Sequence, residues 1–320
     1  MLKIKNITLK HGLALAPMAG VTDRAFRTLC KEYGAEYMVS EMISAKGLHY
    51  HDKKTEILAD FSEGERPVAV QLFGKEEAIV AEAVETVIRR FHPDAVDLNM
   101  GCPMPKIVNN GEGSAMMRDL PQAARVISAA ARAAGNTPLT VKFRTGWDSS
   151  HRNAPELAHV AEECGAAALC IHGRTREQLY RPGVDLETIA RVKAAVSIPV
   201  FGNGDVDSAD AAREMIDQTG VDGIMIGRGA QGNPFLFAQI TDVLEGRPPR
   251  EISRNERLDT ALRHVSLLIH FKGRRMGILE SRKHLGWYLH GIPGAAEARA
   301  RINASGTEEQ LQAIINELRE

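Results

Sequence analysis

Short runs of hydrophobic residues recur through roughly the first 230 positions of the chain, and most of them end at a glycine, a proline or a polar residue. Segments with apolar residues at every third or fourth position lie between these runs, for example residues 76–91, 120–135 and 154–166, which is the spacing of an amphipathic helix. Strands that alternate with helices in this way predict a parallel sheet. We expect eight strands, at residues 13–18, 36–42, 68–74, 95–101, 139–146, 168–173, 199–204 and 223–229.

The number and spacing of these units predict the fold class. Eight units within about 235 residues favour an α/β fold of the closed (β/α)8 TIM barrel type, and no GxGxxG sequence opens the first unit as a dinucleotide-binding sheet would require. The strand pattern stops after Gly232, residues 245–253 have the composition of a linker, and helical patterns fill the remainder. We therefore expect a barrel over residues 1–244 and a small helical domain over residues 245–320.

Composition narrows the class of protein further. The N-terminus has no apolar segment of signal-peptide length, and no run of about 18 apolar residues occurs, so we expect a cytoplasmic protein without a membrane span. The four cysteines form no CxxC pair and have no histidine spacing suited to zinc. We therefore expect neither a disulfide framework nor a metal site.

Charge is distributed unevenly along the chain. The net charge is only −1, but residues 246–320 hold 13 Lys and Arg against nine Asp and Glu, and residues 263–301 hold eight against two, with four histidines among them. A solvated helix face and a surface for nucleic acid both produce such a pattern. Charge alone leaves both interpretations open.

Candidate catalytic residues follow from the barrel. Active sites of such barrels lie at the carboxyl ends of the strands, so the polar residues that close each run are the candidates. The glycines of GNGD (202–205) and IGRG (226–229) leave backbone N–H groups free to bind a phosphate, unless they only permit tight turns. The strand ends carry Pro17, Met18, Glu41, Gln71, Asn99, Cys102, Lys142, Arg144, His172, Asn203, Gly204, Asp205, Gly227 and Arg228.

A flavin mononucleotide fits this outline. Its phosphate would lie at strands seven and eight, where Arg228 offers a fork of donors, and its ring would extend toward Lys142, His172 and Gln71. A lysine beside the ring stabilises the anionic reduced flavin. A buried histidine with a purely structural role is an equal alternative for His172.

Several motifs, in order and over nearly the whole chain, resemble those of the tRNA-dihydrouridine synthases, flavoproteins that reduce uridines in tRNA. RTGW with HRN (144–153) and RKHLGWYLHGIPGA (282–295) point to the bacterial B type of that family. The other motifs are APMAGVTDRAFRTLC (16–30), VQLFG (70–74), DLNMGCPMPKIV (97–108), IHGRT (171–175), GNGD and IGRGAQGNP (226–234).

The resemblance implies roles for individual residues. It implies a helical tRNA-binding domain after the barrel, Cys102 as the catalytic residue and NADPH or NADH as the reductant. The implied flavin contacts are Pro17, Met18, Ala19, Gln71, Lys142, His172, Asn203, Gly204, Asp205, Gly227 and Arg228. We expect substrate and tRNA contacts at Asn99, Lys106, Arg144, Arg174, Arg274, Arg275, Arg282 and Lys283.

The chemistry explains a thiol after the fourth strand. Reduction of the uracil 5,6 double bond needs a hydride at C6 and a proton at C5, and a cysteine with an ordinary pKa of about 8.5 is mostly protonated near neutral pH. Gly101, Pro103 and Pro105 predict a non-helical loop that closes over a flipped base. Cys164 and Cys170, in apolar surroundings, and Cys30, on a helix, are expected to be buried structural residues.

Other functions remain open at this point. A flavin barrel acting on a free pyrimidine would leave the basic tail unexplained, and a non-catalytic RNA-binding protein would not need Cys102. The B-type resemblance suggests the D-loop as the target, and we expect a monomer. Pro105 before Lys106, and the acidic Glu112, depart from the family pattern in the cysteine loop.

Overall fold

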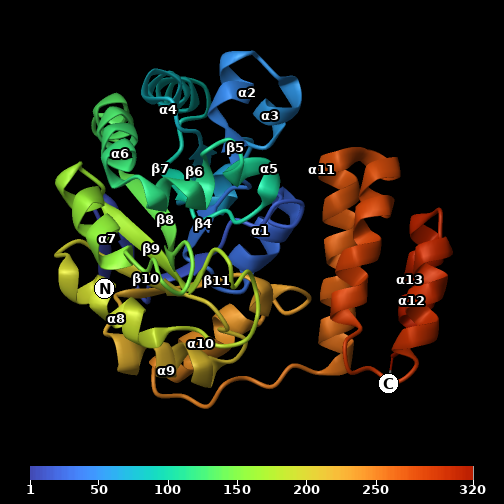
Figure 1. The fold of residues 1–320 in the computed structure, drawn as a ribbon. Coiled ribbons are helices and arrows are strands. Elements are labelled where there is room, and N and C mark those ends of the chain that lie inside the picture. The colour runs from blue at the N-terminus through green and yellow to red at the C-terminus, as the bar shows by residue number, and fades with distance from the viewer. Residues whose placement is uncertain (320) are drawn as a thin grey trace.

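A computed structural model describes residues 1–319, apart from the side chains of residues 53 and 54. Eight parallel strands form a closed barrel, because the pairing of Met38 with Val68 joins the two ends of the sheet. Each strand lies at a predicted run, so the predicted TIM barrel is confirmed (Figure 1). The barrel strands are β3 (Leu13–Leu15), β4 (Tyr37–Val39), β6 (Val68–Phe73), β7 (Ala95–Met100), β8 (Leu139–Gly146), β9 (Ala168–Thr175), β10 (Val200–Asn203) and β11 (Gly223–Ile226).

Helices surround the barrel and bury the outward-facing side chains of its strands. The main helices are α1 (Arg24–Glu32), α4 (Glu77–Phe91), α6 (Leu120–Ala134), α7 (Ala154–Glu163), α8 (Leu186–Ala195), α9 (Ala209–Thr219) and α10 (Leu236–Leu244). The short elements are β5 (Ile43–Ser44), α2 (Ala45–His49), α3 (Lys53–Ile57), α5 (Pro105–Val108) and the 3-10 turns η1 (Glu63–Glu65), η2 (Gly113–Arg118) and η3 (Arg228–Ala230).

An N-terminal hairpin, which the strand pattern did not predict, closes the end of the barrel away from the catalytic edge. Strands β1 (Leu2–Ile4) and β2 (Ile7–Leu9) pair in antiparallel fashion, and their alternate side chains are buried. These side chains pack against the inward-facing residues of the barrel, among them Tyr37 and Phe201. Three residues are too few for a strand to stand out as a periodic pattern.

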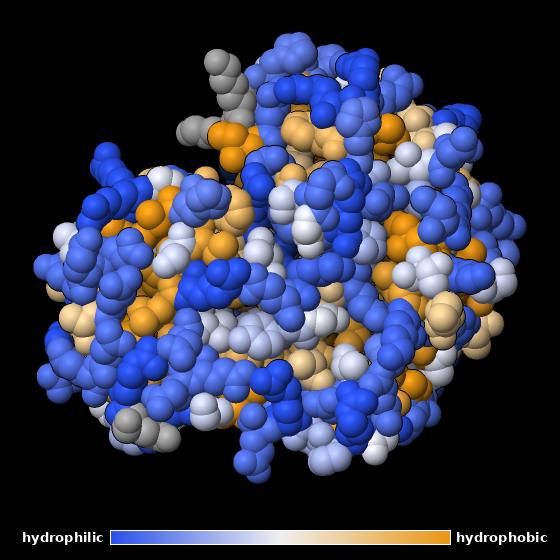
Figure 2. Space-filling view, turned by 180° about the vertical axis from the view of Figure 1, so that it is seen from behind, coloured by the Kyte–Doolittle hydropathy of each residue, from blue (hydrophilic) through white to orange (hydrophobic). Residues whose placement is uncertain are grey.

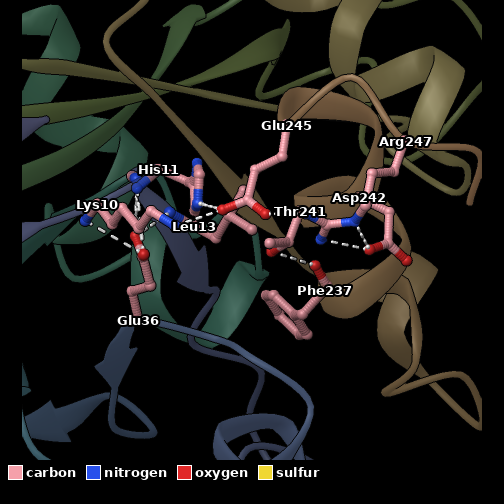
Figure 3. Close-up of polar contacts among 10 residues, drawn as sticks. Lys10, His11, Leu13, Glu36, Phe237, Thr241, Asp242, Glu245 and Arg247 are labelled. Carbon is pink, nitrogen blue, oxygen red and sulfur yellow. Dashed lines mark hydrogen bonds and ion pairs between the residues drawn. The ribbon is translucent and has the colours of Figure 1, made fainter.

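The chain leaves the barrel at a polar cluster that is shown in Figure 3. Glu36 accepts hydrogen bonds from the backbone N–H groups of residues 10–13, and Glu245 binds the side chains of Lys10, His11 and Arg247. Residues 246–253 then run below the barrel, in the view of Figure 1, toward the C-terminal helices. The first residue of the predicted linker is thus held against the barrel.

The C-terminal helices form a bundle beside the barrel. Helix α11 (Arg254–Tyr288) reverses direction at Gly273, whose φ of 77° and ψ of 159° are not helical. The two arms pack closely at Gly277, where a Cβ would lie 2.5 Å from the Cα of Ile269. Helices α12 (Ala295–Ala304) and α13 (Glu308–Asn316) complete the bundle.

The bundle packs against α1 of the barrel. The ring of Phe26 stacks on His264 at 5.7 Å, and Tyr33 shares a 2.8 Å hydrogen bond with Thr260. Figure 2 shows the opposite face of the molecule, where hydrophilic side chains prevail and hydrophobic ones form small separate patches. None of the helices within residues 1–319 combines the length and the apolar character needed to cross a membrane.

Candidate active site

A cavity of about 910 Å³ opens at the carboxyl ends of the barrel strands. It brings together side chains from β6, β7, β8, β9 and β10, as expected when the ends of parallel strands meet. Cys102, Asn99, Arg144 and Arg174 line it. The predicted flavin contacts all line it as well: Pro17, Met18, Ala19, Gln71, Lys142, His172, Asn203, Gly204, Asp205, Gly227 and Arg228.

Lys142 places an ammonium group inside the cavity. Its Nζ donates a 3.0 Å hydrogen bond to Oδ1 of Asn203, and Nδ2 of Asn203 donates to the carbonyl of Met225 at 2.7 Å. The second bond fixes the orientation of the amide, so the amide oxygen must face the lysine. The hydrogen-bond partner of Lys142 is therefore a neutral amide and not a carboxylate.

His172 is a neutral imidazole with a defined tautomer. Burial lowers its pKa well below the usual value, and the positive charges of Lys142, Arg144, Arg174 and Arg228 lower it further. Nη1 of Arg174 lies 3.3 Å from Nε2 of His172, and a guanidinium can only donate. Nε2 must then accept, which leaves the proton on Nδ1.

The turns after β10 and β11 form a cradle of backbone groups. Gly204 has a φ of 127°, and a Cβ there would lie 2.8 Å from the side chain of Val184. A Cβ at Gly229 would lie 2.1 Å from the carbonyl oxygen of Val206, so the two turns touch without room for a side chain. Within residues 1–319, the backbone N–H groups of Gly204, Asp205, Gly227 and Arg228 have no hydrogen-bond acceptor.

The loop that carries Cys102 is held at several points. Oδ1 of Asn99 accepts hydrogen bonds from the N–H groups of Gly101 (3.1 Å) and Cys102 (2.9 Å). Ser114 donates both its N–H and its hydroxyl to the carbonyl of Cys102. Nε of Arg144 donates to the carbonyl of Gly101 at 2.8 Å.

The Cys102 side chain lines the cavity and is only 9% exposed. Burial raises the pKa of its thiol, while the backbone N–H of Met104 and the charge of Arg144 oppose that rise. The group is therefore a protonated thiol near neutral pH. Such a thiol can donate a proton to a ligand in the cavity.

Comparison with known proteins identifies the family. The model of the dihydrouridine synthase (Dus) family matches residues 14–319. This chain belongs to the dihydrouridine synthase family. The tRNA-dihydrouridine synthase B of Pseudomonas aeruginosa is 43% identical over 306 residues, which are 95% of this chain and 91% of that protein. The tRNA-dihydrouridine synthase B of Vibrio cholerae is 42% identical and covers 98% of this chain and 97% of its own length.

Solved structures support the fold of this family member. A 2-naphthoyl-CoA reductase in complex with 2-naphthoyl-CoA matches with a TM-score of 0.59 at 13% identity, over 77% of this chain and 52% of that one. At this identity the match shows a common barrel fold. The family resemblance read from the motifs is confirmed by the family model and by these relatives.

One feature of the cysteine loop differs from the expectation for this dihydrouridine synthase. The prediction of a wholly non-helical loop is wrong, because Pro105 is the first residue of the short helix α5. Proline has no backbone N–H, and the N–H of the first helical residue has no acceptor within the helix, so proline is well suited to that position. Glu112, directly before η2, is 4% exposed, and burial raises its pKa while Lys46 and Lys75 oppose the rise.

The structure adds Tyr180 to the family's cavity in this chain. Its ring lies under the guanidinium groups of Arg228 (4.8 Å) and Arg144 (5.6 Å), and it is 51% exposed. It comes from the loop between β9 and α8, outside any strand end, so the prediction from strand ends does not include it. An aromatic residue in the polar segment REQLYRPG is the signal that was available.

The predicted tRNA contacts fall into two groups. Asn99, Arg144 and Arg174 line the cavity, whereas Lys106 and the basic residues of α11 lie outside it. Arg274 pairs with Glu309, Arg282 donates to the carbonyl of Ser305 and Lys283 donates to the carbonyl of Gly20. Within residues 1–319, no acidic partner lies within 4.0 Å of Arg275 or Arg299, the latter on α12.

The remaining cysteines do not line the cavity. Cys30 and Cys170 are buried as predicted, and burial raises the pKa of Cys170 to about 11. The prediction that Cys164 is buried is wrong, because it ends α7 and is half-buried. No cluster of three or more metal-ligating side chains occurs in the described part of the chain.

Proposed function

We propose that this dihydrouridine synthase family member reduces the 5,6 double bond of uridine in the D-loop of tRNA, with Cys102 as the proton donor. The observation that carries the proposal is the cavity itself. It combines an ammonium group, a cradle of free backbone N–H groups and a protonated thiol. Together these groups can hold a flavin and donate a proton to a uracil. As an oxidoreductase it requires a hydride carrier in that cavity.

The residues present fit a flavin mononucleotide. The free N–H groups of Gly204, Asp205, Gly227 and Arg228 suit a terminal phosphate, and Lys142 and Gln71 suit the polar edge of the ring. When bound, the flavin supplies the hydride. The neutral His172, with its proton on Nδ1, offers a donor without adding positive charge.

The chain's own residues supply the rest of the chemistry. The Cys102 thiol donates its proton to C5 of the uracil as the hydride reaches C6, and the resulting thiolate is reprotonated from solvent. Asn99 and Arg144 hold the loop backbone so that the thiol faces the cavity. The positive charge of Arg144, whose pKa burial lowers to about 10, stabilises the thiolate that the step leaves.

The tRNA and the reductant complete the proposal. Residues 1–244 form the catalytic domain and residues 245–320 bind tRNA. The tRNA then contacts both the bundle and the barrel mouth, which is the end of the barrel where the cavity opens. NADPH reduces the flavin before tRNA binds, and the protein acts as a monomer.

The dihydrouridine content of tRNA tests the proposed function. In cells that lack this protein and other dihydrouridine synthases, expression of the parent chain should produce dihydrouridine in tRNA digests, located in the D-loop by mass spectrometry of fragments. Cys102→Ala should produce almost none at equal protein level. An absence of dihydrouridine with the parent chain would contradict the proposal.

A further inference from the structure

A chain of polar side chains runs from inside the barrel to the loop that carries Cys102. Asp97 on β7 lies beside Gln71 on β6, since the two residues are register partners in the sheet. Nε2 of Gln71 donates to Oδ2 of Asp97 at 2.7 Å, and Oε1 of Gln71 accepts from Nδ2 of Asn99 at 2.9 Å. Asn99 in turn accepts from the backbone of Gly101 and Cys102.

The donor-to-acceptor direction of this series of hydrogen bonds is fixed at both ends. Backbone N–H groups can only donate, so Asn99 must turn its oxygen to the loop and its nitrogen to Gln71. A carboxylate can only accept, so Gln71 must turn its nitrogen to Asp97. The two amides therefore have a single orientation that satisfies every member.

Asp97 is a buried carboxyl group that the proposed reaction does not use. It is 2% exposed, and its other oxygen accepts the hydroxyl of Thr140. Burial raises its pKa, whereas the hydrogen bonds from Thr140 and Gln71 and the charge of Lys142 lower it. A buried carboxyl group is costly unless its hydrogen bonds are satisfied, and here both oxygens are satisfied.

We propose that Asp97 is a positioning residue for the Cys102 thiol: its carboxylate fixes the orientation of Gln71 and Asn99, and through them it holds the backbone of the loop at residues 101 and 102. The inference rests on the proposed role of Cys102 as the proton donor. It assigns Asp97 no contact with substrate.

The reactivity of the Cys102 thiol reports how firmly the loop backbone at residues 101 and 102 is fixed, and its measurement does not require tRNA. The protein, as purified with its flavin, is treated with iodoacetamide at pH 8, and mass spectrometry of peptides follows each of the four cysteines. Asp97→Asn keeps the shape but lets both amides rotate, so Cys102 should react about threefold to tenfold faster. Asn99→Asp sets a carboxylate oxygen against the oxygen of Gln71, and we expect at least a tenfold increase.

The double variant is the decisive case. Combining Asp97→Asn with Asn99→Asp exchanges the amide and the carboxylate on either side of Gln71. The Gln71 amide can then rotate, accept a hydrogen bond from position 97 and donate one to position 99. The loop N–H groups still find an oxygen. Cys102 should then react within about twofold of the parent rate.

Two controls separate loop positioning from general loosening. Cys30 and Cys170 are buried elsewhere, so they should keep their parent rates in every variant. Ser114→Ala frees the same loop through its other attachment, and adding the double exchange should not reverse that increase.

Three results would overturn the inference: a double variant as reactive as Asn99→Asp alone, parent-like reactivity in both single variants, or faster reaction of Cys30 and Cys170 together with Cys102. If Asp97→Asn does not fold, parent-like reactivity of Asn99→Asp by itself overturns it. If Cys102→Ala still reduces tRNA, the proposed function fails on the proton donor, and the alkylation rates still report separately on the hold.

Discussion

The barrel mouth and the C-terminal bundle are both rich in cations, but the cations have different partners. At the mouth, Lys142 faces an amide oxygen and Arg144 faces three backbone carbonyls, while Arg174 and Arg228 share the carboxylate of Asp205. In the bundle, carboxylates pair with most of the cations. These pairs include Arg263 with Glu32, Lys272 with Asp23 and Glu280, Arg274 with Glu309, and Arg301 with Glu317.

This difference separates two uses of positive charge. A cation held by neutral acceptors keeps its charge available to an incoming anion, and its geometry is fixed in advance. The charge of a cation held by a carboxylate is largely offset by its partner, and such exposed pairs contribute little net energy to folding. Lys142 and Arg144 are therefore available to a ligand, whereas Arg263 and Lys272 contact the barrel and Arg274 and Arg301 join helices within the bundle.

The largest expected effect tests the chemistry of the mouth. Cys102→Ala should keep its flavin and accept electrons from NADPH, but the rate of flavin reoxidation by tRNA should fall about 10²–10⁴-fold, since a positioned acid is lost. Rapid-mixing absorbance of the flavin measures both half-reactions. Cys102→Ser, a far weaker acid of similar shape, should resemble Cys102→Ala, and parent-like reoxidation in either variant would contradict the assignment.

A second prediction tests whether the mouth cation serves the cofactor. Lys142→Ala removes a charged donor from the cavity, so flavin should dissociate about tenfold to a hundredfold more readily. Dialysis followed by flavin fluorescence measures the retained fraction, and chromatography of the released flavin should show FMN and no FAD. Lys106→Ala, outside the cavity, is the matched control. Equal retention in the two variants would place the flavin elsewhere.

Acid stability tests the contact between bundle and barrel. His264 is buried against Phe26, and burial lowers its pKa to about 4. Its contribution is complete above pH 6.5 and is lost as the pH falls toward 4, because the unfolded chain binds the proton first. At pH 5 the loss is about 2 kcal/mol.

Denaturant unfolding of variants at pH 7.5 and pH 5 measures that contribution. His264→Gln does not titrate, so it should lose about 2 kcal/mol less than the parent between the two pH values. His290→Gln, at an exposed position, should behave as the parent does. The same pH dependence in His264→Gln and the parent would contradict this account of the interface.

The smallest expected effect distinguishes free from paired cations in the bundle. Replacing Arg275 and Arg299 with alanine should reduce the slope of log affinity for tRNA against log salt by about 1.4–1.8, as expected for two lost phosphate contacts. Arg274→Ala breaks a pair with Glu309 and should change the slope less than either single free arginine. An equal change at Arg274 would mean that its pair opens on binding.

The sequence allowed the mouth to be predicted better than the bundle, for a physical reason. Strand ends converge in any parallel barrel, so local patterns sufficed to place Lys142, His172 and Cys102 in one cavity. The pairing of Arg263 with Glu32 joins residues 231 positions apart and depends on how the bundle docks. No local pattern contains that information.

Two other features, the β1–β2 hairpin and Tyr180, could not be predicted from local sequence patterns for the same reason. The β1–β2 hairpin is recognisable only from the apolar barrel floor that it covers, and Tyr180 belongs to a loop with no period. The motif DLNMGC placed Asn99 beside Cys102, but its hydrogen bonds to the loop depend on Gln71 and Asp97 in the folded barrel.

Reoxidation of the reduced protein by different substrates tests the central claim most directly. The flavin is reduced anaerobically with NADPH and then mixed either with tRNA that lacks dihydrouridine or with free uracil and orotate, while flavin absorbance is recorded. We expect tRNA to reoxidise the flavin and one or more of its uridines to gain 2 Da, with no reaction of the free pyrimidines. Reoxidation by a free pyrimidine and not by tRNA would contradict the account.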